Sequence, residues 1–268
     1  MSKLGTVQRL ELGGRRVAAW VPNVITSTTP ILVAHDAQNY LIPKSETWNG
    51  QNWQVVEALE AGRILPDAQG NLPLILSIHL NDEALRLNEL APEDYMRANP
   101  HLWKLLPPEL TPPNFEPFGN SYAEAIAKRV VPEACERWGI THSVERTAIA
   151  GSSMGGLASL YAIGRHPQTF GAALAYSTHW PIGGMDLVNY LVEALPVGKG
   201  HRFWTDRGSV GLDASYEPFH LAAITALESR GLARDQDFIA SVFYGTDHCE
   251  DHWARRVELP INWWLQAL

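Results

Sequence analysis

Cysteine and long apolar runs are both scarce in this sequence. Its only cysteines are Cys135 and Cys249, too few for the disulfide framework of a small secreted domain, so we expect two free thiols. No stretch approaches the roughly 18 consecutive apolar residues of a transmembrane helix. The first residues, MSKLGTVQRL, also lack the apolar core of a signal peptide. These absences predict a cytoplasmic protein that does not bind membranes.

Positive charge is also in short supply. The chain has 21 Lys and Arg against 29 Asp and Glu, which gives a formal net charge of −8. Its basic residues are scattered, and the missing basic stripe argues against a nucleic-acid partner. The length of 268 residues, with 46% hydrophobic and 19% charged residues, suits a globular α/β protein. We predict one domain over residues 1–268, and the sequence leaves open whether it forms homo-oligomers.

Short apolar runs alternate with helical patterns along most of the chain. The first two runs are joined by Gly13 and Gly14, which predicts a hairpin. Later runs are apolar throughout, as in strands that are buried on both faces. We therefore predict an α/β fold with a mostly parallel sheet, helices on both faces and an N-terminal antiparallel hairpin. The predicted strands are 6–12, 15–22, 31–35, 72–80, 146–151, 170–177, 201–206 and 237–245, and the predicted helices are 52–62, 122–138, 155–165 and 217–230.

One segment, around residues 81–120, interrupts this alternation. It contains seven prolines and shows no regular pattern. A second domain would need its own core and a linker, and the sequence offers neither. We expect an irregular excursion over a single domain, of the kind that often forms the wall or lid of a ligand site.

The candidate nucleophile is Ser153, at the centre of the G-x-S-x-G pattern that begins at Gly151. The bare pattern occurs by chance in roughly one chain of this length in ten. Its setting is more specific, because a predicted strand ends just before the serine and a predicted helix follows it, as in a nucleophile elbow. The backbone N–H of Met154 would then face a developing oxyanion. A glycine-rich turn with a capping serine is the alternative, and Ser152 fits less well because it is not central.

A serine nucleophile of this kind is followed in the chain by an acid and then by a histidine. His248 lies directly after the last predicted strand, in TDHCEDHW, whereas the competing His252 falls in the next helix. The acid should follow the preceding strand, where the loop offers Asp206, Asp213 and Glu217. We favour Asp213 because it lies in the loop proper, with Asp206 as the alternative. Its role would be to hold the imidazole tautomer and to stabilise the imidazolium.

Three segments in the same order resemble a known family over nearly the whole chain. They are VAHDAQNY, GSSMGGLASLYAIGRHPQTFGAALAYS and HCEDHWARRVELPINWWL. Together they are similar to the α/β-hydrolase esterases that include S-formylglutathione hydrolase (esterase D), feruloyl esterases, trilactone siderophore esterases and mycolyltransferases. The resemblance implies an α/β-hydrolase fold with Ser153 as nucleophile and His248 as base. It also favours Asp213, because the family's acid follows a glycine that corresponds to Gly208.

The resemblance also implies a second oxyanion N–H, from Gln38. This residue follows a family Asp-Gly pair whose glycine is replaced here by Ala37, a departure that puts the backbone angle of the turn in question. The segment RLNELAP is similar to another family motif, in which we take Arg86 and Glu89 to be structural. Among the ten tryptophans, Trp180 follows a strand end and is our candidate for lining the substrate pocket.

The sequence thus predicts a serine esterase that hydrolyses a small-molecule carboxylic ester or thioester through an acyl-enzyme on Ser153. Such chemistry needs no metal and no cofactor. Two alternatives stay open, a non-catalytic family member that binds a ligand and an acyltransferase that uses an alcohol acceptor. The acyl and alcohol parts of the substrate are not predicted.

Overall fold

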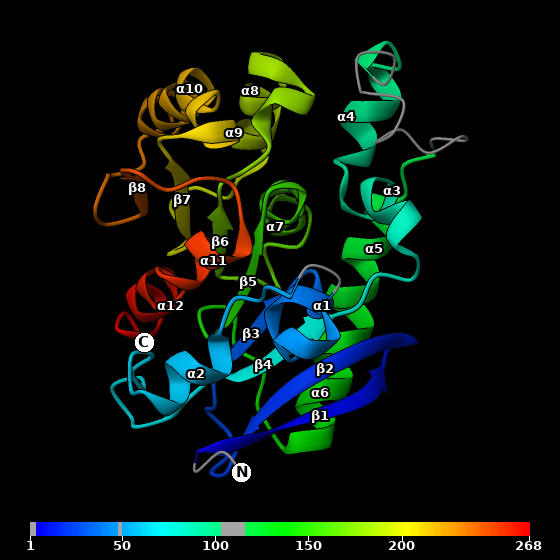
Figure 1. Ribbon diagram of the computed structural model, residues 1–268, viewed down its shortest axis with the longest axis vertical. Coiled ribbons are helices and arrows are strands. Elements are labelled where there is room, and N and C mark those ends of the chain that lie inside the picture. Colours follow the sequence, from blue (N-terminus) through cyan, green and yellow to red (C-terminus); the bar gives the residue numbers. More distant parts are fainter. Residues whose placement is uncertain (1–3, 48–49, 103–115) are drawn as a thin grey trace.

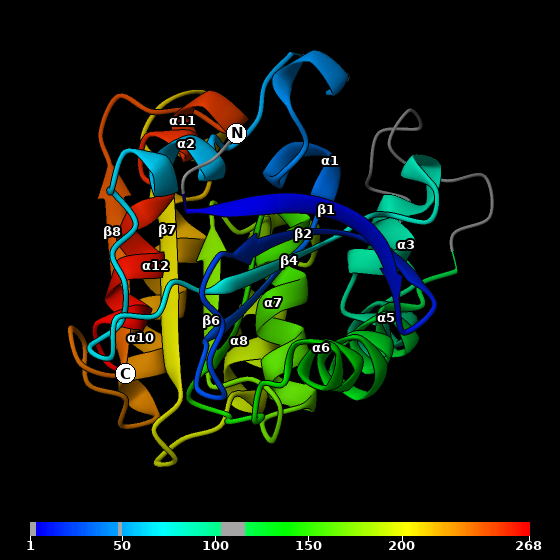
Figure 2. The same cartoon turned by 90° about the horizontal axis from the view of Figure 1, so that it is seen from below.

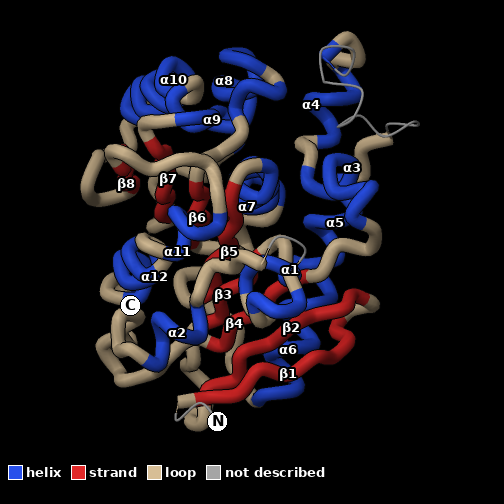
Figure 3. Tube along the Cα trace, in the orientation of Figure 1, coloured by secondary structure: helices blue, strands red, loops and turns tan. Residues whose placement is uncertain are grey.

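A single eight-stranded sheet organises the computed structural model, which describes residues 4–47, 50–102 and 116–268. The strands lie in the order β1-β2-β4-β3-β5-β6-β7-β8 (Figure 1). All eight predicted strands are present, and Figure 3 separates them from the helices by colour. Their bounds are β1 Gly5–Leu12, β2 Arg15–Pro22, β3 Ile31–Ala34, β4 Leu74–Ile78, β5 Thr147–Ser152, β6 Ala172–Tyr176, β7 Arg202–Gly208 and β8 Phe238–Phe243.

The sheet has an antiparallel start and a parallel remainder. Strands β1 and β2 form a hairpin, and β2 pairs antiparallel with β4. The two residues of the hairpin turn between β1 and β2, Gly13 and Gly14, have φ values of 57° and 75°, and two-residue hairpin loops of this type require positive φ. Every other neighbouring pair is parallel. The predicted fold class, with its N-terminal antiparallel hairpin, is confirmed.

Helices cover both faces of the sheet because the strands alternate two sets of apolar side chains. In β3, Ile31 and Val33 belong to one buried cluster, whereas Leu32 and Ala34 belong to the other. In Figure 2, α1 and α2 lie on the opposite side of the hairpin from α6. The first cluster includes residues of α5 (Gly119–Ala125), α6 (Val131–Trp138), α7 (Met154–Arg165), α8 (Gly184–Ala194) and α10 (Glu217–Ser229), and the second includes residues of α1 (Ala37–Tyr40), α2 (Val55–Glu60) and α12 (Glu258–Leu265).

The excursion expected around 81–120 is described only in part, since residues 103–115 lie outside the described ranges. Its first half is more regular than we expected, with two short helices, α3 (Arg86–Leu90) and α4 (Glu93–Ala98). Leu90 and Met96 explain this order, because both are buried in the same cluster as α7. Among the helices of the described ranges, none combines the length and apolar character needed to cross a bilayer.

The parallel strands carry the residues that follow them to one edge of the sheet. In open α/β sheets, ligands bind outside the carboxyl ends of the strands. This edge therefore brings together segments that are far apart in the sequence. They are residues 35–39 after β3, Ser153 after β5, residues 177–179 after β6, residues 209–213 after β7 and residues 244–249 after β8.

Candidate active site

The backbone at Ser153 is strained and firmly held. Strand β5 ends at Ser152 and α7 begins at Met154, and Ser153 between them has φ 57° and ψ −120°. A non-glycine residue with such angles costs about 1–3 kcal/mol, and it persists only where its surroundings enforce it. Here the Ser153 N–H donates to Tyr176 O at 2.9 Å, and Ser153 O accepts the His179 N–H at 3.1 Å. The first contact comes from the last residue of β6 and the second from the segment that follows it, so this neighbouring stretch of chain fixes the turn.

The glycines on either side of Ser153 are explained by close packing. A Cβ at Gly151 would lie 2.8–2.9 Å from the backbone of Gly155, so a side chain there would force β5 and α7 apart. One at Gly155 would lie 3.4 Å from Cβ of His35, which is tight. The G-x-S-x-G pattern is therefore a steric requirement of this strand–turn–helix junction.

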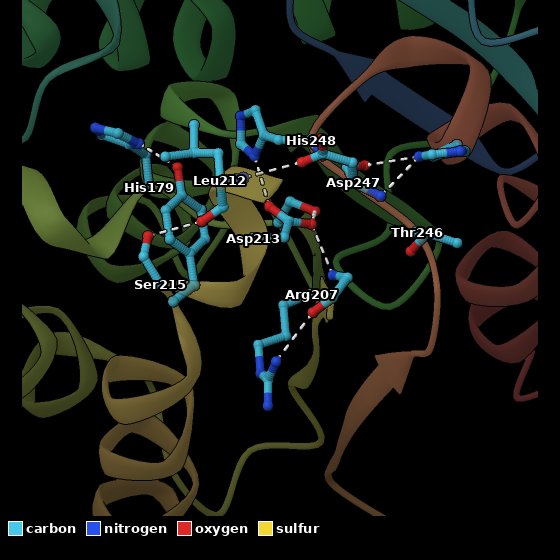
Figure 4. A network of polar contacts seen from close by, with 12 residues as sticks. His179, Arg207, Leu212, Asp213, Ser215, Thr246, Asp247 and His248 are labelled. Atoms are coloured by element: carbon cyan, nitrogen blue, oxygen red, sulfur yellow. Dashed lines mark hydrogen bonds and ion pairs between the residues drawn. The ribbon is translucent and has the colours of Figure 1, made fainter. Parts of the chain in front are cut away.

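His248 and Asp213 lie within hydrogen-bonding distance at the same edge of the sheet. His248 Nδ1 is 2.7 Å from Asp213 Oδ1 (Figure 4). The other carboxylate oxygen accepts the Gly208 N–H and the Ser177 hydroxyl, both at 2.6 Å. Burial alone would raise the pKa of Asp213, but hydrogen bonds from His248, Ser177 and Gly208 hold it below its ordinary value. An ionised carboxylate can only accept hydrogen bonds, so His248 Nδ1 must carry the proton of this hydrogen bond. In the neutral imidazole, Nε2 is then free to accept a hydrogen bond from another group.

Two loops and two aromatic rings hold the imidazole in place. The His248 ring meets Tyr216 and Trp253 edge-on, with ring centroids 5.4 and 4.9 Å away. Asp247 Oδ1 accepts the His248 N–H at 2.7 Å and the Leu212 N–H at 3.0 Å, so it ties the histidine loop to the loop of Asp213 (Figure 4). The orientation of the imidazole is thus set by both loops.

The alternative acid and the alternative base have other partners. Asp206 is fully buried in β7, where its carboxylate accepts from Arg256 Nη2 and from Trp204 Nε1, each at 2.9 Å. His252 lies in α11 (Glu250–Ala254), and its Nδ1 accepts the Asp247 N–H at 2.7 Å. The structure brings Asp213, and not Asp206, to the His248 imidazole.

A cavity of about 490 Å³ opens at Ser153 and His248. Arg86 lines it and is held by Asp36 through two hydrogen bonds of 2.9 and 2.7 Å. Burial alone would raise the pKa of Asp36, but Arg86 lowers it below its ordinary value. Arg86 is therefore paired within the protein while still facing the cavity. Other lining residues are Gln38, Asn39, Gln51, Trp53, Leu80, Ser152, Cys249, Glu250 and Trp253.

The two candidate oxyanion donors both lie at helix starts. Met154 is the first residue of α7, and Gln38 is the second residue of α1, so neither N–H has an acceptor within its own helix. Gln38 also lines the cavity. Asp36, and not Ala37, adopts the left-handed conformation of this turn, with φ 57°. The replacement of the family's glycine by Ala37 therefore introduces no backbone strain at this turn.

The structure does not bring Trp180 to this cavity. Its side chain is 2% exposed and packs in the core with α7 and α8, because the chain turns into a short helix, Trp180–Ile182, directly after His179. The cavity is lined instead by the indoles of Trp53 and Trp253. Glu89, which we expected to be structural, is buried and pairs with Arg15 at 2.8 Å.

Tyr216 and His179 were missed by the sequence reasoning. The buried phenol hydroxyl of Tyr216 hydrogen-bonds to His179 Nδ1 and to the Ser153 side chain. Burial lowers the pKa of His179 to about 4, with a smaller contribution from His248, so its imidazole is neutral at pH 7. Neither residue belongs to a spacing pattern that would have identified it.

Within the described ranges, no group of three or more His, Cys, Asp and Glu side chains could hold a metal ion. What the arrangement provides is a hydroxyl on a strained turn, an imidazole oriented by a buried carboxylate, a helix-start N–H directly after the serine, and a second helix-start residue, Gln38, on the cavity lining. Side chains arranged in this way suit nucleophilic attack on a carbonyl carbon.

Comparison with known proteins places the chain among esterases. Residues 110–257 match the model of a family described as "Putative esterase". A curated relative, the "Uncharacterized protein YbbA" of Bacillus subtilis (strain 168), is 22% identical over 156 residues, which are 56% of this chain and 61% of the relative.

Solved structures share the fold at low identity. The enterobactin esterase FES from Shigella flexneri has a TM-score of 0.67 at 17% identity, covering 97% of this chain and 58% of its own. The IroE-like serine hydrolase from Shewanella oneidensis has a TM-score of 0.66 at 14% identity, with 97% and 79% covered. A ferulic acid esterase gives 0.60 at 12% identity, with 97% and 96% covered. The chain thus spans about three-fifths of the length of YbbA and of the Shigella protein.

Proposed function

Because this chain belongs to the putative esterase family, we propose that it is a serine esterase that works through an acyl-enzyme on Ser153. The observation that carries the proposal is the 2.7 Å contact between His248 Nδ1 and the buried Asp213, beside the cavity that holds Ser153. The family match also confirms the resemblance drawn from the sequence. Two structural neighbours are named as enterobactin and ferulic acid esterases, which supports a small-molecule ester as substrate.

In the acylation step, Ser153 Oγ attacks the carbonyl carbon of the ester while His248 Nε2 takes the hydroxyl proton. Asp213 stabilises the imidazolium that forms and keeps its ring oriented. The negative charge that develops on the carbonyl oxygen is stabilised by the N–H groups of Met154 and Gln38. Each such donor lowers the barrier by about 3 kcal/mol. The C–O bond then breaks, and the alcohol leaves with the proton from His248.

Deacylation repeats these roles with water as the nucleophile. His248 takes a proton from the water molecule, and the hydroxide adds to the acyl carbon of the Ser153 ester. The same two N–H groups stabilise the second oxyanion. Collapse of this intermediate releases the acid and returns the proton to Ser153 Oγ. An alcohol acceptor in place of water would make the protein an acyltransferase, which product analysis with added alcohols distinguishes.

A fluorophosphonate probe and p-nitrophenyl acetate test this proposal together. The probe should label the wild-type protein, and Ser153→Ala should abolish labelling, whereas Ser152→Ala should still be labelled. Ser153→Ala and His248→Ala should each lower kcat by about 10³-fold or more, because members of a triad act as one unit. Labelling that persists in Ser153→Ala, or near-normal turnover by either Ala variant, would contradict the assignment.

A further inference from the structure

Ser177 stands behind the catalytic acid and makes no contact with the cavity. It follows β6, is fully buried and has φ 40°. Its hydroxyl is 2.6 Å from Asp213 Oδ2. Two further groups lie within hydrogen-bonding distance of Ser177 Oγ, Trp253 Nε1 and Arg256 Nη2, each at 3.0 Å. Three polar contacts thus converge on one buried serine oxygen.

The chemistry of these partners fixes the direction of every hydrogen bond. The indole N–H of Trp253 and the guanidinium of Arg256 can only donate, whereas a serine hydroxyl has two lone pairs and one proton. Both lone pairs of Ser177 Oγ are therefore occupied. Its single proton has only Asp213 Oδ2 to go to, so the hydroxyl is locked as a donor to the carboxylate.

Asp206 anchors this arrangement from the other side. Its Oδ1 lies 2.9 Å from Arg256 Nη2 and accepts the Ser177 N–H at 3.1 Å. The side chains of Arg256 and Asp206 are 2% and 0% exposed, so the ion pair is shielded from water. A buried pair of this kind keeps its geometry because breaking it would leave an uncompensated charge. Asp206 therefore holds the guanidinium that in turn orients Ser177.

We propose that Ser177 is a positioning residue for Asp213, and that hydrogen bonds from Arg256 and Trp253 orient its hydroxyl for this role. The proposal rests on the proposed function of the Ser153 site. Together with the Gly208 N–H, the hydroxyl occupies Asp213 Oδ2 with two donors. Only Oδ1 is then left for the imidazole. The carboxylate is kept ionised and cannot rotate away from His248.

This role also accounts for the last motif of the sequence, which the triad itself leaves unexplained. The segment HCEDHWARR places Trp253 on α11 and Arg256 just beyond it, on the chain that continues from His248. The segment that supplies the base therefore also supplies both donors to Ser177. Base and acid are oriented by one stretch of chain.

Ser177→Ala is the test, with Ser77→Ala as its matched control. Ser77 is also fully buried on the sheet, but within the described residues its hydroxyl has no hydrogen-bond partner. We expect Ser177→Ala to lower kcat for p-nitrophenyl acetate by about tenfold, as for one hydrogen bond to a charged group. KM should be unchanged, because Ser177 does not line the cavity. Ser77→Ala should leave kcat and KM unchanged.

The pH profile separates positioning from a packing defect. Removing one donor leaves more negative charge on the Asp213 carboxylate, which faces the His248 imidazole and attracts a proton there more strongly. The acidic limb of kcat/KM should therefore move to higher pH in Ser177→Ala and stay in place in Ser77→Ala. Should the alanine variant fold poorly, Ser177→Gly carries the same test, since glycine adopts φ 40° without strain.

Three results would overturn the inference or its premise. An unshifted acidic limb with wild-type kcat in both Ser177 variants would remove Ser177 from the mechanism. An equal loss in Ser77→Ala would reduce the effect to general packing. If the wild-type protein shows no labelling at Ser153, the proposed function fails as a whole, and the positioning role fails with it.

Discussion

At Asp213, a single side chain combines full burial with a lowered pKa. Burial by itself favours the neutral acid, but donors from His248, Ser177 and Gly208 surround the carboxylate and favour the charged form. All three donors need an acceptor at this position. An amide would present an NH₂ group to at least one of them, so no isosteric neutral residue can replace the carboxylate.

Asp213→Asn should therefore lower kcat by about 10³-fold or more, with little change in KM. The amide favours the wrong imidazole tautomer and leaves a buried donor without an acceptor. Asp186→Asn, an exposed substitution on α8, is the control and should behave as wild type. Steady-state kinetics on p-nitrophenyl acetate measure both. Wild-type kcat in Asp213→Asn would remove this carboxylate from the mechanism and return attention to Asp206.

Sequence order alone could identify Ser153, His248 and Asp213 as candidates, because each follows a predicted strand at a position that the architecture specifies. It could not identify Ser177 or Tyr216. The role of Ser177 depends on donors that reach it from α11 and beyond. Trp180 illustrates the same limit, since its position after a strand end did not tell which way the indole would turn.

At the scale of elements, the two loops of the site depend on one close approach. Gly211 has φ 55°, and a Cβ there would lie 2.0 Å from the carboxylate of Asp247. That carboxylate joins the loops by accepting from the Leu212 and His248 N–H groups. Any side chain at position 211 would displace the link between the Asp213 loop and the His248 loop.

Gly211→Ala should destabilise the protein and also slow catalysis by about tenfold or more, because Asp247 must move and the His248 loop moves with it. Gly231→Ala is a matched control. It also has a positive φ, of 82°, but a Cβ there meets no atom within 4 Å. The unfolding free energy of the control should decrease by only about 1 kcal/mol, because alanine is strained at a positive φ, and its kcat should be unchanged. Urea unfolding and kinetics give both quantities, and equal kcat values for the two variants would refute the link.

Some elements were predictable from the sequence, and others were not. Strands such as β3 and β5 are short apolar runs buried on both faces, so composition alone marks them. Helix α8 was not predicted, although its buried residues Leu187, Val188, Leu191 and Val192 recur at helical spacing, because no side chain caps its first turn to mark where it begins. Helix α4 follows Pro92 and is held by Asn120, which bonds to Glu93 and Asp94 from a distant part of the chain.

At the scale of the whole molecule, one sheet supports two apolar cores, and the described part of the excursion packs into the first of them. We propose on this basis that the chain forms a single domain. Burial lowers the pKa of three of its histidines to about 4, namely the buried His35 and His220 and the half-buried His179. His220 is distinctive because neither of its ring nitrogens has a hydrogen-bond partner among the described residues.

These histidines predict acid sensitivity in a defined window of pH. The unfolded chain takes up protons near pH 6.5, whereas the folded protein does so only near pH 4, so the unfolding free energy falls as the pH drops between these values. Each histidine contributes a slope of up to about 1.4 kcal/mol per pH unit. Buried carboxylates with lowered pKa values, such as Asp36 and Asp213, add a loss only below about pH 4.

His220→Phe tests this account, since it removes one titrating group without removing a hydrogen bond. Urea titrations at several pH values between about 7 and 4 give the unfolding free energy of the variant. It should fall less steeply with decreasing pH than that of wild type, and the slope should differ by up to about 1.4 kcal/mol per pH unit, the contribution of one histidine. His101→Gln, at an exposed position, should leave the slope unchanged. A His220→Phe slope as steep as that of wild type would mean that the folded protein takes up a proton at His220 as readily as the unfolded chain does. Burial without partners would then be no barrier to protonation at this position, and the acid sensitivity would have to come from the other histidines whose pKa values burial lowers, which are His35, His79, His166 and His179.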